Sequence, residues 1–448
     1  MRRELPAMLA LALFAAGGSW AAPTQYDRLA LPADELFEAA VGFVQGGDYA
    51  NLTKTLQLLR PLLASVRART GEDSGADLES AIALKDGNWA RASLYRLIYL
   101  DLRLNLEAAS TAGSQDAARE FLLPASIDYA FLAPVISAQD KAAGLTFRSA
   151  MRLAYRSGEP ASARDALKTL RSLSHLFVKT GDLVAVLSSD LPTYREAYDG
   201  LRGAWPTPVP ILALDNGGPA LADGTRIVVA FGAKAAAQRY PPGVPLVYCV
   251  APGSVVGREG TTIMIDMAPE ASVLLGKLLQ IHPGLKRIGV VWLSAALAGN
   301  VAAFKRAGAD ASVEVFAEPL EDANALPGRL RELKRDQVDG LWLPADSQVL
   351  TPYNFEILRD YSYANGIPLF APTENLVERG ATASVSVSYQ ELGRAAADAA
   401  KSALADRKQP ADLYVGSAEI SVNLAAAKES SLSIPDAVLK KAARVFTK

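Results

Sequence analysis

The sequence contains very little cysteine and histidine. Cys249 is the one cysteine among 448 residues, so no disulfide can form within the chain. The two histidines, His175 and His282, are too few for a histidine-rich metal site. These shortages argue against a disulfide scaffold and against a zinc enzyme. Cys249 lies in an apolar run and is expected to pack as a small hydrophobic residue.

The chain also lacks an excess of either charge. Lys and Arg number 46 against 48 Asp and Glu, which gives a formal net charge of −2. A protein that binds a phosphate backbone needs a clustered basic face, so nucleic acid is not an expected partner. Hydrophobic residues make up 50% of the chain, which indicates a globular protein. At ~150 residues per domain, the length predicts about three domains.

Familiar catalytic motifs are missing. The sequence contains no Gly-x-Ser-x-Gly, no His-Glu-x-x-His and no Gly-x-Gly-x-x-Gly after a strand. Gly276-Lys277 resembles the end of a phosphate loop, but Ala271 replaces its first glycine and Leu278 replaces its magnesium-binding hydroxyl. No nucleophile can be combined with a base, so an enzyme is the least favoured class of function. We expect no catalytic residues, no metal and no cofactor.

Residues 1–21 have the features of a signal peptide. Arg2 and Arg3 precede an apolar run over residues 5–16, and Ser19-Trp20-Ala21 forms a small-x-small cleavage site. The apolar run is shorter than the ~20 residues of a membrane span, and no cysteine follows it to carry a lipid anchor. We therefore expect a soluble, exported protein in the periplasm, without a membrane anchor after cleavage. An uncleaved N-terminal anchor is the alternative.

Residues 24–203 are predicted to form an all-α helical bundle. Apolar residues recur at three- and four-residue steps, which places them on one face of a helix. Two such stripes are Tyr95, Ile98, Tyr99, Leu102 and Leu106, and Leu167, Leu170, Leu173 and Phe177. We expect about six helices and no strand here, with the aromatic residues in the core. A proline-rich linker over 204–210 then ends the helical pattern.

Residues 211–448 are predicted to form an α/β domain. Short β-rich runs alternate with helical stretches of ten to fifteen residues, a pattern typical of parallel sheets. The runs are 226–231, 244–250, 262–266, 287–292, 312–317, 340–343, 368–371 and 383–387. The clearest helices are 269–282, 296–307 with Gly308 as its stop, and 353–364 with Asn365-Gly366 as its stop.

The α/β half resembles the substrate-binding proteins of ABC transporters, in an uncharacterised branch of the type I periplasmic-binding fold. The segments that carry the resemblance are 229–236 (VAFGAKAA), 243–248 (GVPLVY), 282–290 (HPGLKRIGV), 343–346 (LPAD), 367–371 (IPLFA), 377–381 (VERGA), 387–393 (VSYQELG), 422–428 (VNLAAAK) and 432–435 (LSIP). The resemblance extends over about residues 226–446. The resemblance implies two parallel-sheet lobes that face each other across a ligand-binding cleft.

The resemblance also implies where a ligand would bind, because ligands of open α/β sheets lie beyond the carboxyl ends of the strands. The candidate ligand-binding residues are Gly232, Ala233, Ala251, Pro252, Ser294, Asp346, Ser347, Thr373, Glu374 and Tyr389. Asp346 would accept a hydrogen bond from a cationic or hydroxylated ligand, or it is instead a helix N-cap or turn residue. Tyr389 would offer a ring face and a hydroxyl, or it is instead ordinary packing at a helix start.

Two departures from the family pattern affect the first lobe. Only residues 211–214 provide a strand before 226–231, so the first lobe looks truncated, and Ala251-Pro252 stands where relatives tend to carry Asp-Pro. The favoured function is that of a periplasmic solute-binding protein, which delivers a small molecule to an ABC permease. The alternative is a scaffold or sensory accessory protein whose helical domain docks a protein partner and whose binding lobe no longer serves transport.

Overall fold

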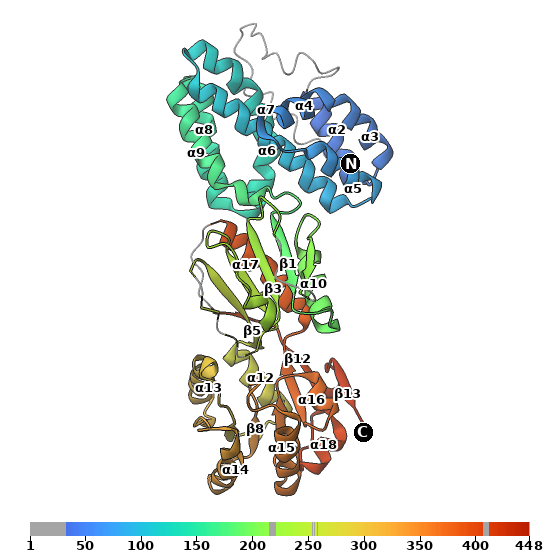
Figure 1. Ribbon diagram of the computed structural model, residues 1–448, viewed down its shortest axis with the longest axis vertical. Coiled ribbons are helices and arrows are strands. Elements are labelled where there is room, and N and C mark those ends of the chain that lie inside the picture. Colours follow the sequence, from blue (N-terminus) through green and yellow to red (C-terminus); the bar gives the residue numbers. More distant parts are fainter. Residues whose placement is uncertain are drawn as a thin grey trace. The chain divides into compact units, whose positions relative to one another are not determined.

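The computed structural model describes residues 33–214, 221–252, 254, 256–257, 259–405 and 412–447 (Figure 1). The predicted signal peptide lies outside the described residues. The contacts divide the chain into two compact units. The helical unit comprises the chain up to Asp182 together with Pro206–Val209 and the short segment that begins at Leu404. The α/β unit comprises Leu183–Trp205, Pro210–Ala403 and the C-terminal region.

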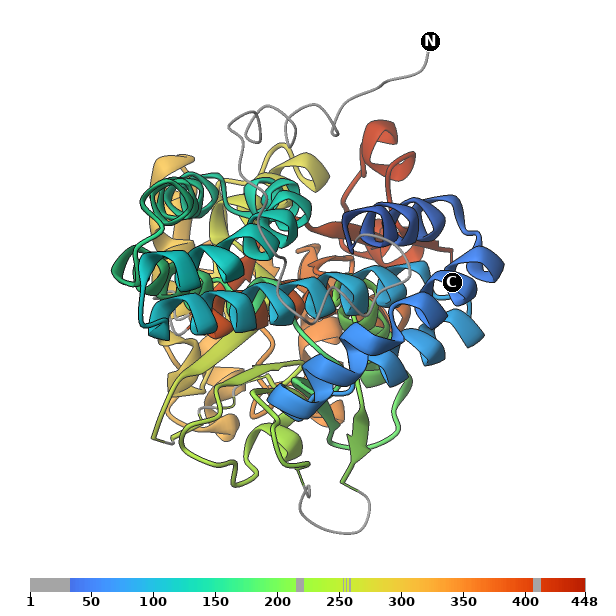
Figure 2. The ribbon, with the colours of Figure 1, turned by 90° about the horizontal axis from the view of Figure 1, so that it is seen from above.

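The helical unit contains eight α-helices over its described residues, where about six were expected. They are α2 (Ala33–Gly46), α3 (Tyr49–Leu58), α4 (Arg60–Thr70), α5 (Ser74–Ala83), α6 (Gly87–Thr111), α7 (Gln115–Gln139), α8 (Lys141–Ser157) and α9 (Pro160–Ser172), followed by the 3-10 turn η1 (Ser174–Leu176). The last four α-helices form a bundle in which α6 packs on α7 and α9, and α8 packs on the same two helices (Figure 2).

Local sequence signals set where these helices begin and end. Asp48, Asp86 and Asp140 are N-caps whose carboxylates accept hydrogen bonds from backbone amides of the first turn. Gly71 and Gly158 follow α4 and α8 in the left-handed conformation that glycine adopts without strain. The short connections therefore allow successive helices to pack against each other in antiparallel pairs.

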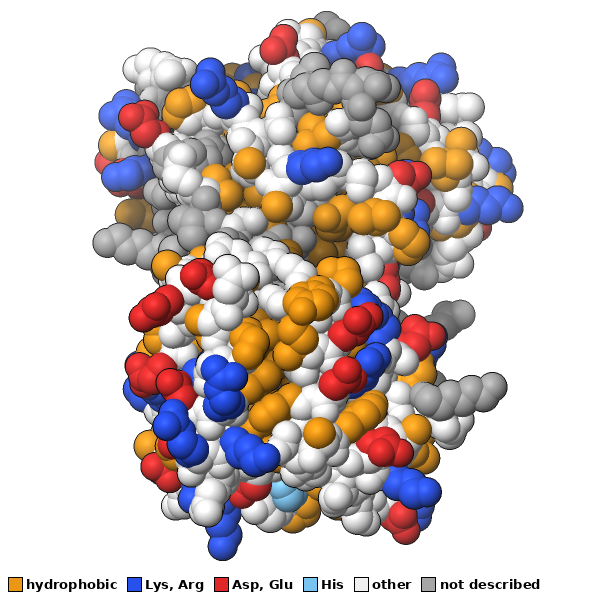
Figure 3. Space-filling view, turned by 60° about the horizontal axis from the view of Figure 1, so that its bottom comes forward, with side chains coloured by type: hydrophobic (Ala, Val, Ile, Leu, Met, Phe, Trp, Pro, Cys, Tyr) orange, Lys and Arg blue, Asp and Glu red, His pale blue; other side chains and the backbone are white. Residues whose placement is uncertain are grey.

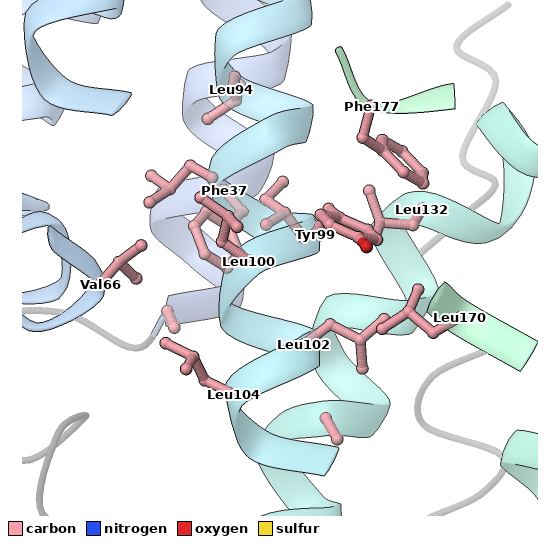
Figure 4. Packing of buried hydrophobic residues seen from close by; sticks show 14 of the residues in the cluster. Phe37, Val66, Leu94, Tyr99, Leu100, Leu102, Leu104, Leu132, Leu170 and Phe177 are labelled. Carbon is pink, nitrogen blue, oxygen red and sulfur yellow. The ribbon is translucent and has the colours of Figure 1, made fainter. Parts of the chain in front are cut away.

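The predicted apolar stripes lie in the core of the helical unit, with Tyr95 partly buried at its edge (Figure 4). Tyr99 on α6 stacks on Phe177, with ring centroids 4.9 Å apart. Arg96, one turn earlier, donates to the carbonyl of Phe177 at 2.7 Å and forms an ion pair with Glu72 at 2.7 Å. The arginine, with a side chain only 9% exposed, therefore links α6 to the loop before α5 and to the end of the bundle.

The α/β unit contains two sheets, each of which forms the centre of one lobe. The first sheet has the strand order β11-β5-β4-β3-β1-β2, and all of its neighbouring pairs are parallel. Its strands are β1 (Leu183–Leu187), β2 (Ile211–Ala213), β3 (Ile227–Phe231), β4 (Leu246–Cys249), β5 (Thr262–Pro269) and β11 (Asp412–Val415). The helices next to them in the chain are α10 (Pro192–Ala204) and the short α11 (Ala233–Ala236).

The second sheet has the order β13-β12-β10-β9-β8-β6-β7, in which the pair β10–β12 is antiparallel. Its strands are β6 (Arg287–Val290), β7 (Glu314–Phe316), β8 (Gly340–Trp342), β9 (Leu369–Ala371), β10 (Ala383–Ser386), β12 (Glu419–Asn423) and β13 (Arg444–Phe446). The helices are α12 (Ala271–Ile281), α13 (Ala298–Asp310), α14 (Leu326–Arg335), α15 (Pro352–Asn365), α16 (Glu374–Glu378), α17 (Tyr389–Leu404), α18 (Leu424–Glu429) and α19 (Asp436–Leu439), with the 3-10 turns η2 (Ala295–Leu297) and η3 (Ala323–Ala325).

All eight predicted strand segments contain a strand, which confirms the parallel α/β class. Three expectations need correction. Leu183–Leu187 is a buried central strand inside a stretch that was expected to be helical. With β1 and α10 before β2, the first lobe has its opening βα unit, so the expected truncation is wrong. The compact units also divide at Asp182 and Leu183 rather than at residue 203.

A further correction concerns Gly308, which does not stop its helix, since α13 continues to Asp310. A Cβ at Gly308 would overlap the side chain of Val315 and would lie 2.8 Å from the carbonyl oxygen of Val313. The glycine is therefore required by the close approach of α13 to β7 and not by a change of backbone direction. Gly366, by contrast, ends α15 in the left-handed conformation as expected.

Candidate ligand-binding site

The carboxyl ends of β1 and β3 form the first-lobe side of the candidate site. Ser188 follows β1, and its hydroxyl accepts a hydrogen bond at 2.9 Å from the amide of Ala235 in α11. Gly232 follows β3 with φ of 93°, and its amide donates to the carbonyl of Cys249 at 2.9 Å. A Cβ at Gly232 would lie 2.5 Å from Ser188 Oγ and 2.6 Å from Tyr194 Oη. The glycine thus makes room for the phenol of Tyr194, which extends from α10 to this edge of the sheet.

The end of β4 contributes a strained turn. Val250 follows the strand with φ of 54°, a left-handed conformation that is rare for a β-branched residue and costs about 1–3 kcal/mol. The turn leaves Ala251 buried and Pro252 exposed. Strained backbone of this kind is common at ligand-binding sites, where the surrounding structure holds it in place.

In the second lobe, Asp346 joins the loops that follow β6 and β8. It is fully buried, and one carboxylate oxygen accepts hydrogen bonds from the amides of Leu293 at 2.6 Å and Ser294 at 2.8 Å. The other oxygen accepts from the amide of Gln348 at 3.0 Å. These contacts are those of a turn residue, one of the roles that the sequence allowed for Asp346. Asp346 is not a helix N-cap, because the N-cap of α15 is Thr351. Asp346 fixes the loop that carries Ser294.

Glu374 begins α16, just beyond the carboxyl end of β9. Its carboxylate accepts a hydrogen bond from Ser421 Oγ at 3.1 Å and faces Arg444 Nε at 3.5 Å. Thr373, which precedes it, is half-buried and makes no side-chain cap hydrogen bond. The pairing with Ser421 and Arg444 places the Glu374 carboxylate beside β12, the antiparallel strand next to β10.

Tyr389 lies where the chain leaves the second lobe, at the first position of α17, and is half-buried. This helix packs closely on α10 of the first lobe, because a Cβ at Gly393 would overlap the carbonyl oxygen of Ala197, and one at Gly200 would overlap that of Gln390. The start of α17 is therefore fixed to the first lobe although it follows a strand of the second lobe.

The electrostatic interactions show that side chains of the two lobes lie near each other. Burial raises the pKa of the Tyr389 hydroxyl, and the neighbouring Glu196, Tyr194 and Glu374 raise it further. Burial likewise raises the pKa of Glu196 on α10, with further contributions from Glu419 and Glu374 of the second lobe. Carboxylates and phenols of α10, α16, α17 and β12 thus converge at one location.

Of the predicted site residues, the structure places Gly232, Glu374 and Tyr389 around this group. Ala233 and Ser347 are exposed, whereas Ser294 is only 6% exposed and shares the Asp346 loop. Sequence reasoning missed Tyr194, Glu196 and Glu419. The first two lie in a stretch that was assigned to the helical bundle, and no residue pattern indicated that it begins the first lobe.

A pocket of about 390 Å³ lies elsewhere, at the amino-terminal edge of β8 and β9. His282, Lys334 and Ser431 are among its lining residues, and no predicted site residue lines it. Among the described residues, no group of three or more His, Cys, Asp or Glu side chains is arranged to hold a metal ion.

Comparison with known proteins confirms the family resemblance. Residues 271–446, which include the second sheet and most of the candidate site, match the family model described as ABC transporter substrate binding protein. This segment is therefore similar to the family, whereas the helical unit and strands β1–β5 of the first lobe precede the part that the family model covers. The family is one of ligand-binding proteins. No curated protein sequence matches the chain.

Several solved structures align with part of the chain at low sequence identity. An ABC domain from Streptococcus pneumoniae in complex with L-Trp is 18% identical, with a TM-score of 0.41, and the match covers 59% of this chain and 100% of that one. A ligand-free, open substrate-binding protein with adhesive properties from Clostridium difficile is also 18% identical, with a TM-score of 0.42 and coverage of 60% and 100%. A solute-binding protein from Clostridium phytofermentas with bound L-rhamnose is 10% identical, with a TM-score of 0.38 and coverage of 57% and 99%.

Proposed function

We propose that the protein is an exported, periplasmic solute-binding protein that captures a small organic molecule between the two lobes of its α/β unit. The protein performs no chemistry on the ligand and delivers it to an ABC permease. The observation that carries the proposal is the convergence of Tyr194 and Glu196 from the first lobe with Glu374 and Tyr389 from the second. A ligand held by both walls would stabilise the closed arrangement of the lobes.

The side chains of the site suggest what kind of ligand it holds. Carboxylates accept hydrogen bonds, and a phenol both donates and accepts them. Such a wall favours a ligand with several donors, such as hydroxyl or ammonium groups, and a tyrosine ring adds an apolar face for stacking. Ser294, Thr373 and Ser347 would supply hydroxyl groups from the second-lobe loops. Asp346 would act indirectly, because it accepts hydrogen bonds from the amides of Leu293 and Ser294 and so positions their loop.

Native mass spectrometry of protein purified gently from the periplasm tests this function. The mass of the folded protein is compared with its mass after denaturation. We expect a small-molecule adduct that is released on unfolding, and its mass would identify the ligand class. A mass without adduct, together with no thermal shift across a panel of sugars, amino acids and amines, would argue against solute binding.

The alternative function is that of a scaffold or sensory accessory protein, in which the helical unit docks a protein partner. One observation favours it, because the helical unit is a separate compact unit with its own core. A fragment of residues 24–182 should then fold and retain a periplasmic or membrane-facing partner in crosslinking experiments. The alternative has lost one of its original supports, because the first lobe has its opening strand β1 and is not truncated.

A further inference from the structure

We propose that helix α8 of the helical unit docks the protein on an anionic phospholipid membrane surface. The proposal is independent of the ligand-binding function, because it rests on α7 and α8 alone. In Figure 1, α8 lies at the outer edge of the helical unit. Its buried face carries Phe147, Met151 and Ala154. The exposed face of the same helix carries the groups that would contact the membrane.

The charge of α8 has one sign. Its 17 residues include Lys141, Arg148, Arg152 and Arg156 and no acidic residue, in a chain whose formal net charge is −2. The three arginines recur every four residues, so they form a stripe along one side of the helix. In the part of the chain that the structure describes, neither Arg152 nor Arg156 forms an ion pair. The guanidinium groups of Arg152 and Arg156 are therefore available to an anionic partner.

Apolar side chains lie beside this stripe. Leu145 is 53% exposed and Leu153 is 57% exposed, and their spacing of eight residues places both on the outer side of α8. A soluble helix usually places polar residues at such positions. Basic residues beside exposed leucines are the combination by which an amphipathic helix binds a membrane interface, with its apolar side chains among the acyl chains and its cations at the headgroups.

The neighbouring helix α7 supports α8 from below. It packs on α8, with the rings of Tyr129 and Phe147 in an edge-to-face contact at 5.3 Å. By length and composition α7 is apolar enough to cross a membrane, and 33% of its most apolar stretch is buried. Leu122, Leu132 and Ile136 of this helix are in the core, so we assign it a place under α8 at the interface and not a transmembrane role.

The combination of arginines and exposed leucines on α8 favours a lipid surface over other anionic partners. A nucleic acid would pair with the arginines but would leave Leu145 and Leu153 in water. The face of the α/β unit visible in Figure 3 carries both basic and acidic side chains, on either side of an apolar strip. α8 differs from this face in that its charged side chains are all basic.

Vesicle co-sedimentation of the full chain tests the proposal. Vesicles of phosphatidylcholine alone are compared with an equal mixture of phosphatidylcholine and phosphatidylglycerol. We expect the protein to pellet with the mixed vesicles, to stay in solution with phosphatidylcholine, and to be released by added salt. The double variant R152Q/R156Q should weaken binding by about thirty-fold, on the basis of ~1 kcal/mol for each basic residue near an anionic surface.

Two further variants make the result specific. The variant L145S/L153S should also weaken binding, because it removes the apolar contact and keeps the charge. The matched control R331Q/R335Q removes two exposed arginines from α14 of the other unit and should bind as the unmodified protein does. The thermal melts of all three should match that of the parent protein, because the residues are exposed.

Three results would overturn the proposal: equal pelleting by both vesicle types, wild-type binding of R152Q/R156Q, and no pelleting at all. The last result would favour an acidic protein partner.

Discussion

Gly393 on α17 lies against the backbone of Ala197 on α10, with no room for a Cβ between the two helices. Gly200 makes the reciprocal close approach to Gln390. Two glycines therefore allow the backbones of α10 and α17 to touch, and this contact fixes the start of α17, including Tyr389, to the first lobe.

We predict that Gly393→Ala destabilises the α/β unit by at least about 1–3 kcal/mol, because the new methyl group displaces one helix from the other. Urea denaturation monitored by circular dichroism measures the effect. The matched control is Gly276→Ala in α12, where an added Cβ meets nothing within 4 Å. The control should be neutral or should stabilise the protein by up to about 1 kcal/mol, through helix propensity. Equal stability of the two variants would show that the α10–α17 contact is looser than described.

Asp346→Ala should lower the free energy of unfolding by about 2–4 kcal/mol. The substitution leaves the amides of Leu293, Ser294 and Gln348 without their acceptor in a buried place. Chemical denaturation checks the value, with the exposed neighbour Ser347→Ala as a control that should stay within about 0.5 kcal/mol of the parent protein. If Asp346→Ala weakened ligand binding with unchanged stability, the carboxylate would instead contact the ligand directly.

The sequence predicts the second lobe well and the first lobe less well, for a physical reason. Strands such as 287–290 and 369–371 are short apolar runs between helices with clear ends, and this alternation identifies them. β1 is also a short apolar run, but it follows a long helical stretch, where five apolar residues cannot be told from one more buried helical segment. Because β1 is predicted as part of the helical bundle, Tyr194 and Glu196, which follow it on α10, are also predicted in the helical domain and not in the first lobe.

Long-range partners are the second kind of information that the sequence does not contain. The pattern around Asp346 indicates a turn or a cap, and only the structure shows that its carboxylate also binds the loop after β6, more than fifty residues earlier. Gly308 is a similar case. A glycine near a helix end predicts a stop, whereas here its lack of a side chain accommodates Val315 on the next strand.

Tyr389→Ala should weaken ligand retention by about ten-fold or more while the melting temperature of the ligand-free protein stays nearly constant. The expected loss combines a stacking face and a hydrogen-bonding hydroxyl in a desolvated place. The affinity for the molecule recovered by native mass spectrometry is the measurement. Tyr353→Ala is the matched control, since this tyrosine is 72% exposed on α15 and should not affect affinity. A matching loss of stability in Tyr389→Ala would indicate that the ring serves packing instead.

The pH dependence of stability should report on Asp266, which lies on β5 close to where the chain crosses to the second lobe. Its carboxylate accepts hydrogen bonds from the amide of Ala268 at 2.7 Å and from Asn300 Nδ2 on α13 at 3.0 Å. Burial, opposed by these two hydrogen bonds and assisted by the nearby Asp412, raises the pKa of Asp266 from 3.8 to about 6.

Because the folded protein binds this proton more tightly than the unfolded chain, ionisation of Asp266 costs stability as the pH rises from about 4 to 6. The full cost is present above pH 6, and below pH 4 it vanishes because both states are protonated.

Asp266→Asn removes the charge and keeps an acceptor for Ala268, so it should raise the free energy of unfolding by about 2 kcal/mol at pH 7.5 and by little at pH 4. Denaturation curves at these two pH values measure the difference, with Asp336→Asn, at the half-buried C-cap of α14, as a control for charge alone. Parallel shifts at both pH values would mean that Asp266 titrates as an ordinary surface carboxylate.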